Sequence, residues 1–232
     1  DVNDHRKITD NLEKLDMVRS AAPNFYRAGL VWLGKGNVRE ALVFGIDPQK
    51  EKQFRGLDEF LVFGDEKQRP DMDKDSVWLG IAVPGDPNQF TDEYDRDKLK
   101  EYLGQKILLT IPDIEGKRTT GRLTVDNIVK TRSIDSYRAI FMDIEKLHEV
   151  YGRSDNFLPY TFIQIKLKDG VPISEAKVKV AEHYRDFARD VLKLSENKIY
   201  SSRVFEPGKQ ISLYLYELYK QMNMLLLLFG LI

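Results

Sequence analysis

The sequence contains no cysteine, and this absence excludes several kinds of chemistry together. A chain without cysteine forms no disulfide, offers no thiol nucleophile and builds no thiolate metal site. Histidine is scarce as well, with three residues in 232. There are 36 basic and 37 acidic residues, for a net charge of −1, so the chain lacks the overall positive field of a nucleic-acid-binding protein.

Catalytic signatures are missing from what remains. The histidines, His5, His148 and His183, stand far apart in the sequence and show no metal-ligand spacing. The Gly34–Gly36 stretch lacks the Gly-Lys-Ser/Thr ending of a phosphate-binding loop. No serine, including the candidate nucleophiles Ser20, Ser76, Ser133 and Ser136, lies in a Gly-x-Ser-x-Gly sequence. We therefore expect no catalytic residue, no cofactor-binding residue, no metal ligand and no nucleotide.

Two acidic runs offer carboxylates, the ligands that calcium prefers. Asp71, Asp73 and Asp75 alternate as in a calcium loop, but the glycine and the distal glutamate of that loop are missing. The second run comprises Asp92, Glu93, Asp95 and Asp97. We interpret both runs as solvated loops.

The longest apolar feature is the C-terminal stretch, residues 211–232. Ile211, Leu215 and Leu218 fall on one face of a helix, and residues 224–232 are wholly apolar. Nine residues are too few to span a bilayer, which takes about 20. We interpret 211–232 as an exit helix and the start of a transmembrane helix; the alternative is a C-terminal helix packed into a soluble core.

Local patterns predict a mixed α+β chain without a continuous βαβ series. Pro23 is expected to end the first helix, because a proline disfavours the helical conformation of the residue before it. A long polar loop after Pro48 and the region 130–136 are the expected edges of an inserted subdomain. The predicted helices are 8–22, 95–103, 145–151 and 174–192, and the predicted strands are 25–33, 38–46, 106–111, 120–129, 139–144, 161–167 and 198–205. Residues 76–83 form a further buried run, either a strand or a short helix.

Several segments in this order resemble the extracytoplasmic core domain of MacB/FtsX-type ABC transporter permeases. The likeness covers nearly the whole chain, although each motif is short. Two positions depart from the family pattern: Val125–Ile128 reads Val-Asp-Asn-Ile where Val-x-Gly-Ile is usual, and a loop at 84–94 follows VWLG. The segments are LEKLDMVRSAAP (12–23), LVFGIDP (42–48), VWLG (77–80), YLGQKILLTI (102–111), TVDNIVKT (124–131), SYRAIFMDIEKLHEVYG (136–152) and TFIQIKLKDG (161–170).

The resemblance implies a domain between two transmembrane helices at the cell inner membrane, facing the periplasm or the extracytoplasmic side. It implies a porter-like α/β lobe built from both chain ends (1–48 and 132–210) and an inserted smaller β-rich lobe (49–131). The implied partners are a cytoplasmic ATP-binding subunit, a homologous permease copy forming a dimer, and a lipoprotein, exported molecule or periplasmic protein. No catalytic residue is implied. The sequence opens at Asp1 without a signal peptide, which fits an excised loop domain.

Two other functions stay open at this point. A ligand-sensing ectodomain of a membrane receptor would also lack catalytic motifs, and it would show a concave pocket with converging polar groups. A soluble hydrolase is the third possibility, because the members of a catalytic triad can lie anywhere in a chain.

Overall fold

The computed structural model describes residues 5–34, 36–54, 56–64, 72–85, 93–113, 115–131, 137–152, 160–201 and 204. The chain forms two compact units, Asp1–Lys166 and Leu167–Ile232. The C-terminal stretch 211–232, predicted to be an exit helix, lies outside the described residues. So do Asp71, Asp92, Ser133 and Ser136.

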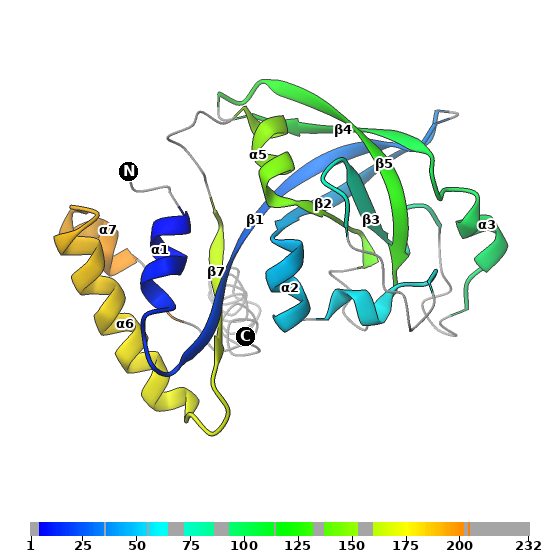
Figure 1. The fold of residues 1–232 in the computed structure, drawn as a ribbon. Helices are drawn as coiled ribbons and strands as arrows, with labels where there is room; N and C mark the ends of the chain where they lie inside the picture. Colours follow the sequence, from blue (N-terminus) through cyan, green and yellow to red (C-terminus); the bar gives the residue numbers. More distant parts are fainter. Residues whose placement is uncertain are drawn as a thin grey trace, which may run out of the picture. The chain divides into compact units, whose positions relative to one another are not determined.

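The first unit contains most of the regular structure (Figure 1). In the second unit, the described residues form the helices α6 (Ile173–Asp190) and α7 (Glu196–Ser201). The helices of the first unit are α1 (His5–Leu12), α2 (Pro48–Phe54), the short 3₁₀ helix η1 (Leu57–Phe60), α3 (Arg96–Lys100) and α5 (Ile144–Tyr151). Its strands are β1 (Val18–Trp32), β2 (Val38–Ile46), β3 (Ser76–Gly80), β4 (Lys106–Pro112), β5 (Arg118–Val129), β6 (Ala139–Asp143) and β7 (Phe162–Leu167), the last ending at the boundary between the units.

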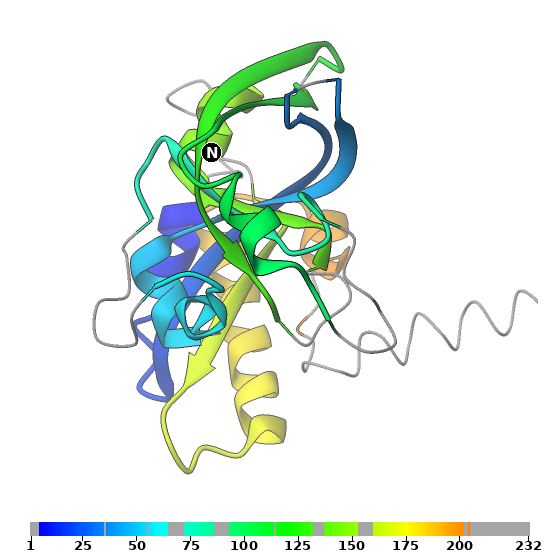
Figure 2. The ribbon, with the colours of Figure 1, turned by 90° about the vertical axis from the view of Figure 1, so that its right-hand side faces the viewer.

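The strands form one mixed sheet that closes on itself. Its order is β2-β6-β3-β5-β4-β1-β7, and β1 also pairs with β2. Six strands therefore form a closed ring, and β7 continues from β1 beyond it; Figure 2 shows the β1–β2 and β4–β5 hairpins curving around this ring. The β2–β6 and β3–β5 pairs are parallel. Closure gives hydrogen-bond partners to the backbone N–H and C=O groups that the edge strands of an open sheet would expose.

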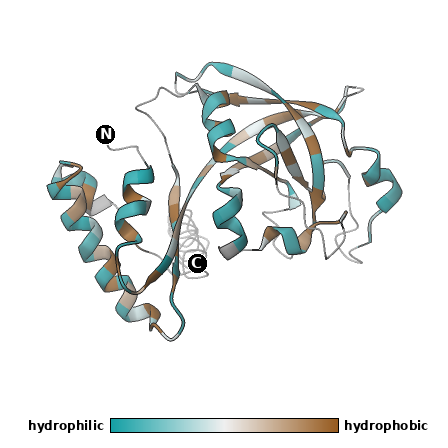
Figure 3. Cartoon of the chain, viewed as in Figure 1, coloured by the Kyte–Doolittle hydropathy of each residue, from teal (hydrophilic) through white to brown (hydrophobic). Residues whose placement is uncertain are grey.

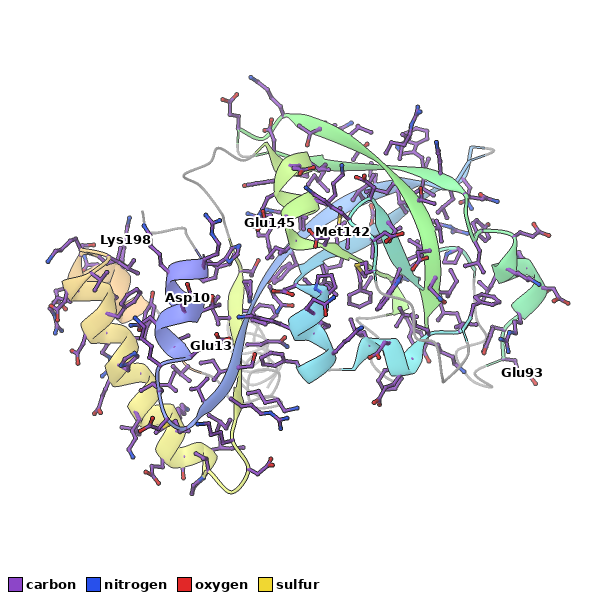
Figure 4. The ribbon with its side chains drawn as sticks, viewed as in Figure 1. Asp10, Glu13, Glu93, Met142, Glu145 and Lys198 are labelled. Atoms are coloured by element: carbon purple, nitrogen blue, oxygen red, sulfur yellow. The ribbon has the colours of Figure 1, made fainter. Side chains whose placement is uncertain are left out.

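The ring is filled by alternate side chains of its strands. Ile107, Leu109 and Ile111 of β4 are buried while their neighbours along the strand are at least partly exposed, as expected for one inward face. Met142 of β6, labelled in Figure 4, is fully buried in the same core. A second apolar cluster contains Phe141 and Trp78 together with Leu57 of η1. In Figure 3, α2 and α3 are mostly hydrophilic while the strands carry the hydrophobic stretches.

Helix α5 packs on strands from around the ring. It contacts β1, β2, β4, β5 and β6, and its residues Ile144, Leu147 and Val150 belong to the core of the ring. Two glycines make this close approach possible, because a Cβ on Gly45 would lie 2.8 Å from Leu147 and one on Gly121 would lie 2.6 Å from Val150. Helix α5 is thus part of the core and not a surface addition.

The start and the end of the chain differ from the sequence prediction. The predicted helix 8–22 is wrong beyond Leu12, since β1 begins at Val18 and runs through Pro23. The proline is tolerated because the pairing of β1 with β2 begins one residue later, at Asn24, so the missing N–H costs no bond of that ladder. The predicted strand 198–205 is wrong at residues 198–201, which belong to α7 (Glu196–Ser201), while residues 202, 203 and 205 lie outside the described residues.

The mixed α+β class is confirmed. The sheet, however, contains strands from both of the lobes that the resemblance implies. Strands β3, β4 and β5 lie in the predicted insert 49–131, and they share the ring with β1, β2 and β6 from outside it. The pairings β3–β6 and β1–β4 join the two parts. The division into two lobes stays a prediction, and its boundaries at 49 and 131 do not separate sheets.

Candidate functional site

Two of the three histidines come together with a glutamate in the first unit. His5 begins α1, and Glu145 and His148 lie on α5. Each offers one ligand atom, and these three atoms lie within 4.8 Å of one another. His5 and His148 are buried, at 4% and 0% exposure, and their rings stack with centroids 5.5 Å apart. We refer to these three residues as the histidine cluster.

Local sequence explains how α5 presents its two members. Asp143 caps the helix, accepting hydrogen bonds from the N–H groups of Glu145 (2.8 Å) and Lys146 (3.1 Å). The helix ends at Gly152, whose φ of 81° is the left-handed conformation that glycine adopts readily. Residues three apart in a helix share a face, so Glu145, labelled in Figure 4, and His148 lie on one side of α5.

An aromatic row continues the cluster into the core. The ring of Phe25 lies 5.3 Å from that of His148 and 5.1 Å from that of Tyr151. The Arg27 guanidinium stands 4.4 Å above Phe25 and 4.9 Å from the Tyr151 ring, and it donates to the Tyr151 hydroxyl at 3.3 Å. The row thus places a cation over Phe25 and Tyr151, one ring away from His148.

Carboxylates crowd the start of α5. Burial raises the pKa of Asp143 above its ordinary value of 3.8, and the nearby Glu145 and Asp47 carboxylates raise it further, while the two N–H donors of α5 oppose the shift. The neighbouring Lys146 is engaged elsewhere, with Asp75 at 2.6 Å and Glu149 at 3.3 Å. The Asp143 carboxylate also acts on the Lys74 ammonium, so charges of both signs lie around the start of α5.

The sequence shows half of this cluster. The Glu-x-x-His spacing of Glu145 and His148 is visible, and it recurs in carboxylate-bridged metal proteins. The third member, His5, lies 140 residues earlier and is brought close by the packing of α1, which no local pattern predicts. His183, the remaining histidine, lies on α6 in the other unit.

The other residues considered from sequence take structural roles where the structure describes them. Asp75 binds Lys146, and the Ser76 hydroxyl donates to the Asp73 carbonyl at 2.9 Å. Asp95 caps α3 by accepting from the Lys98 N–H. Gly34 and Gly36 have φ of 85° and 76° in the β1–β2 turn, and Lys35 lies outside the described residues.

A small polar corner fastens the α1–β1 connection to α2. The Glu13 carboxylate accepts from Lys50 at 2.8 Å and from the Ala21 N–H at 2.9 Å, and Lys50 also donates to the Ala21 carbonyl. Burial acts to raise the pKa of Glu13, but the Lys50 ammonium and the Ala21 N–H outweigh it and lower the pKa below 4.5. The corner holds the start of β1 against α2.

Two surface features bear on binding. Trp32 pairs with Val38 and with Leu108 across neighbouring strands, and all three are exposed, at 47%, 36% and 39%. They form an apolar patch on the outside of the ring. Separately, a cavity of about 10 Å³ is lined by residues of β2, α2 and η1 and by Trp78, room for about one water molecule.

Comparison with known proteins relates the fold to a family of transporters. No protein-family model matches the sequence, and no curated protein matches it. Among solved structures, the periplasmic region of MacB from Actinobacillus actinomycetemcomitans superposes with a TM-score of 0.51 at 17% identity, covering 78% of this chain and 73% of that one. The chain has the fold of a MacB-type periplasmic domain.

A second solved structure supports the same assignment. The extracellular domain of the noncanonic ABC-type transporter YknZ from Gram-positive bacteria superposes with a TM-score of 0.52 at 11% identity, covering 81% of this chain and 83% of that one. The resemblance to MacB/FtsX-type domains is therefore confirmed for the fold. At these identities the likeness concerns the fold alone.

Proposed function

We propose that this chain is the extracytoplasmic domain of an ABC transporter permease, and that it transmits ATP-driven motion across the membrane to a lipoprotein, exported molecule or periplasmic partner. The observation that carries the proposal is the fold: MacB-type and YknZ-type domains match about four fifths of the chain. Its partners would be a cytoplasmic ATP-binding subunit and a second permease copy. The domain itself performs no catalysis, binds no nucleic acid and needs no cofactor.

The construction of the first unit suits a mechanical role. A closed ring of strands with a packed core resists deformation, because protein interiors pack at crystal-like density and transmit strain. Helix α5 contacts five strands of the ring, and the Glu13–Lys50 corner joins the start of β1 to α2. A displacement applied at one element of this unit would therefore be carried by the whole unit.

The alternatives have less support. The cavity beside Trp78, at about 10 Å³, is far smaller than the roughly 300–1,000 Å³ of a small-molecule pocket. A serine hydrolase needs a serine hydroxyl directed at a base, whereas the Ser76 hydroxyl donates to a backbone carbonyl in a turn. Among the described helices, none combines the length and the apolar character required to cross a membrane.

The side of the membrane can be tested by labelling one introduced cysteine. Because the chain has no cysteine, Lys117→Cys on the exposed β4–β5 turn gives a single reactive position once cysteines elsewhere in the full-length protein are replaced. A membrane-impermeant maleimide should label it in intact cells. The matched control is Ala139→Cys, which is fully buried and should stay unlabelled in the folded protein. Labelling of Lys117→Cys only after cell lysis would contradict an extracytoplasmic location.

A further inference from the structure

The geometry points to a divalent transition-metal site, best matched by Zn²⁺, held by His5, Glu145 and His148. The three ligand atoms come from two helices and lie within 4.8 Å of one another. The sequence alone predicts no metal ligand, because the spacing of the three histidines shows none. The site does not depend on the proposed transport function, since it is argued from side-chain geometry alone.

The distances fall in the range that small rotations convert into coordination. Zn–N bonds of about 2.0–2.1 Å place two ligands of a tetrahedral site about 3.3 Å apart. The longest separation in the histidine cluster, at most 4.8 Å, would have to shorten by about 1.5 Å, and the two stacked imidazole rings would have to turn so that a nitrogen of each faces the ion. Both histidines are buried and Glu145 is partly buried, so the donors are already held close together.

The donor set suits first-row transition metals, including Zn²⁺, Cu²⁺ and Fe²⁺. Two imidazoles and one carboxylate form the ligand set of open zinc sites, with water completing the tetrahedron. Mg²⁺ and Ca²⁺ favour all-oxygen ligands and are poor matches. Cu²⁺ would bind the same donors, as the general affinity order of these metals predicts. Zinc is the best match because its tetrahedral preference requires no planar arrangement of the ligands.

Charges of both signs surround the site. Glu145 and Asp47 each act electrostatically on the Asp143 carboxylate, which in turn acts on the Lys74 ammonium. The Arg27 guanidinium lies over Phe25, one ring away from His148. The donor set and its geometry therefore carry the metal site.

Metal binding would have one structural consequence. His5 is the first residue of α1, and the other two ligands belong to α5, which is part of the core of the ring. The ion would fasten the start of the eight-residue α1 to the ring through α5. Such a site adds stability in proportion to metal occupancy, because the metal binds the folded chain and the unfolded chain does not assemble the ligands.

Zinc titration of the full chain tests the site. The protein must carry no histidine tag, and it should be treated with EDTA and dialysed before calorimetry with ZnCl₂. We expect one Zn²⁺ per chain, a rise in melting temperature with ZnCl₂, and no rise with equal MgCl₂. Co²⁺ should give visible d–d absorption bands of tetrahedral intensity, a direct readout of the coordination sphere.

Three variants make the test specific. His5→Gln and Glu145→Gln each remove one ligand and should weaken Zn²⁺ binding by more than about 100-fold, since even indirect changes around metal ligands cost 10–100-fold. His183→Gln, which removes the remaining histidine, should bind Zn²⁺ as the parent does. Circular dichroism of the metal-free Glu145→Gln variant should match the parent, since the change preserves side-chain size. Absence of stoichiometric Zn²⁺ binding by the parent, or equal binding by His5→Gln and His183→Gln, would overturn the proposal.

Discussion

Two glycines determine how closely α5 approaches the ring. A Cβ on Gly45 would lie 2.8 Å from the end of the Leu147 side chain and 3.1 Å from the Ile144 Cα, which belongs to the helix backbone. Cβ atoms essentially never approach other atoms closer than 3.0 Å in real structures. Alanine at this position therefore requires the helix itself to shift.

We predict that Gly45→Ala lowers the free energy of unfolding by about 1–3 kcal/mol, the usual cost of overpacking a core. Urea denaturation of the two proteins measures the difference. The control is Gly85→Ala, where the nearest atom is the mobile end of the Leu99 side chain at 3.3 Å. A loss of stability as large for Gly85→Ala as for Gly45→Ala would show that α5 does not pack as described.

A second residue-scale prediction concerns pH. The pKa of Glu13 is lowered in the folded chain from its ordinary value of 4.5, so its ionised form favours folding. This stabilisation is fully present above pH 4.5 and is lost as the pH falls through the lower folded-state pKa. Glu13 and Lys50 side chains are 33% and 27% exposed, so we expect less than about 1 kcal/mol.

The measurement is the free energy of unfolding between roughly pH 3 and pH 6. Glu13→Gln should flatten the fall in stability at the acidic end of this range. Glu115→Gln provides the control, because its ion pair with Lys117 lies on an exposed turn and should leave the profile unchanged. Parallel curves for the parent and Glu13→Gln would contradict the described Glu13–Lys50 corner.

At the scale of single elements, the sequence predicts best where local signals mark both ends. Asp95 caps α3 and Gly104 follows it with φ of 75°, and α5 lies between Asp143 and Gly152 in the same way. The β4–β5 hairpin was predicted for the same reason, from two alternating runs around a turn.

The prediction of helices and strands fails where a contact between residues far apart in the sequence overrides a local rule. The rule that proline ends a helix is sound, but residues 18–22 belong to β1, whose first half associates with β7 through the Thr161 N–H and the Asn24 carbonyl. That pairing joins residues 137 positions apart, which local periodicity cannot reveal. The histidine cluster shows the same limit. The sequence analysis did not use the spacing of Glu145 and His148, and no local pattern predicts that His5 lies beside them.

The short α1 depends on packing for its stability, since an eight-residue helix is marginal in isolation. Ile8 is 1% exposed, and we predict that Ile8→Ala lowers the free energy of unfolding by about 2–5 kcal/mol, the cost of a buried cavity. Lys7→Ala, one position away on the exposed side of α1, should change it by less than about 0.5 kcal/mol. Equal effects of the two changes, measured by chemical denaturation, would contradict the burial of Ile8.

At the scale of the whole molecule, the sequence indicated the class and the family resemblance indicated the fold, but ring closure was not predictable. Closure depends on β1–β2, β1–β4 and β3–β6, and the last joins strands about 60 residues apart. Pairings of this kind are set by the assembled core and carry no local sequence signature. The order of the segments therefore predicted the fold, but it did not predict which strands pair in the sheet.

The C-terminal stretch provides a whole-molecule prediction that rests on the sequence. If residues 211–232 begin a transmembrane helix, deleting residues 222–232 should leave the melting temperature unchanged and reduce self-association and detergent binding. If they pack in a soluble core, the deletion removes several large buried side chains and should lower stability by several kcal/mol. A large drop in melting temperature with unchanged association would contradict the membrane interpretation.

The most direct test of the proposed function is the identity of the partner. The full-length protein should be purified in mild detergent from its native membranes, and the co-purifying proteins identified by mass spectrometry and assayed for ATP hydrolysis. We predict a stoichiometric ABC-type ATP-binding subunit and vanadate-sensitive ATPase activity in the complex. Co-purification of a signalling kinase or methyl-accepting protein without an ATP-binding transporter subunit would contradict the permease assignment and favour a sensory role.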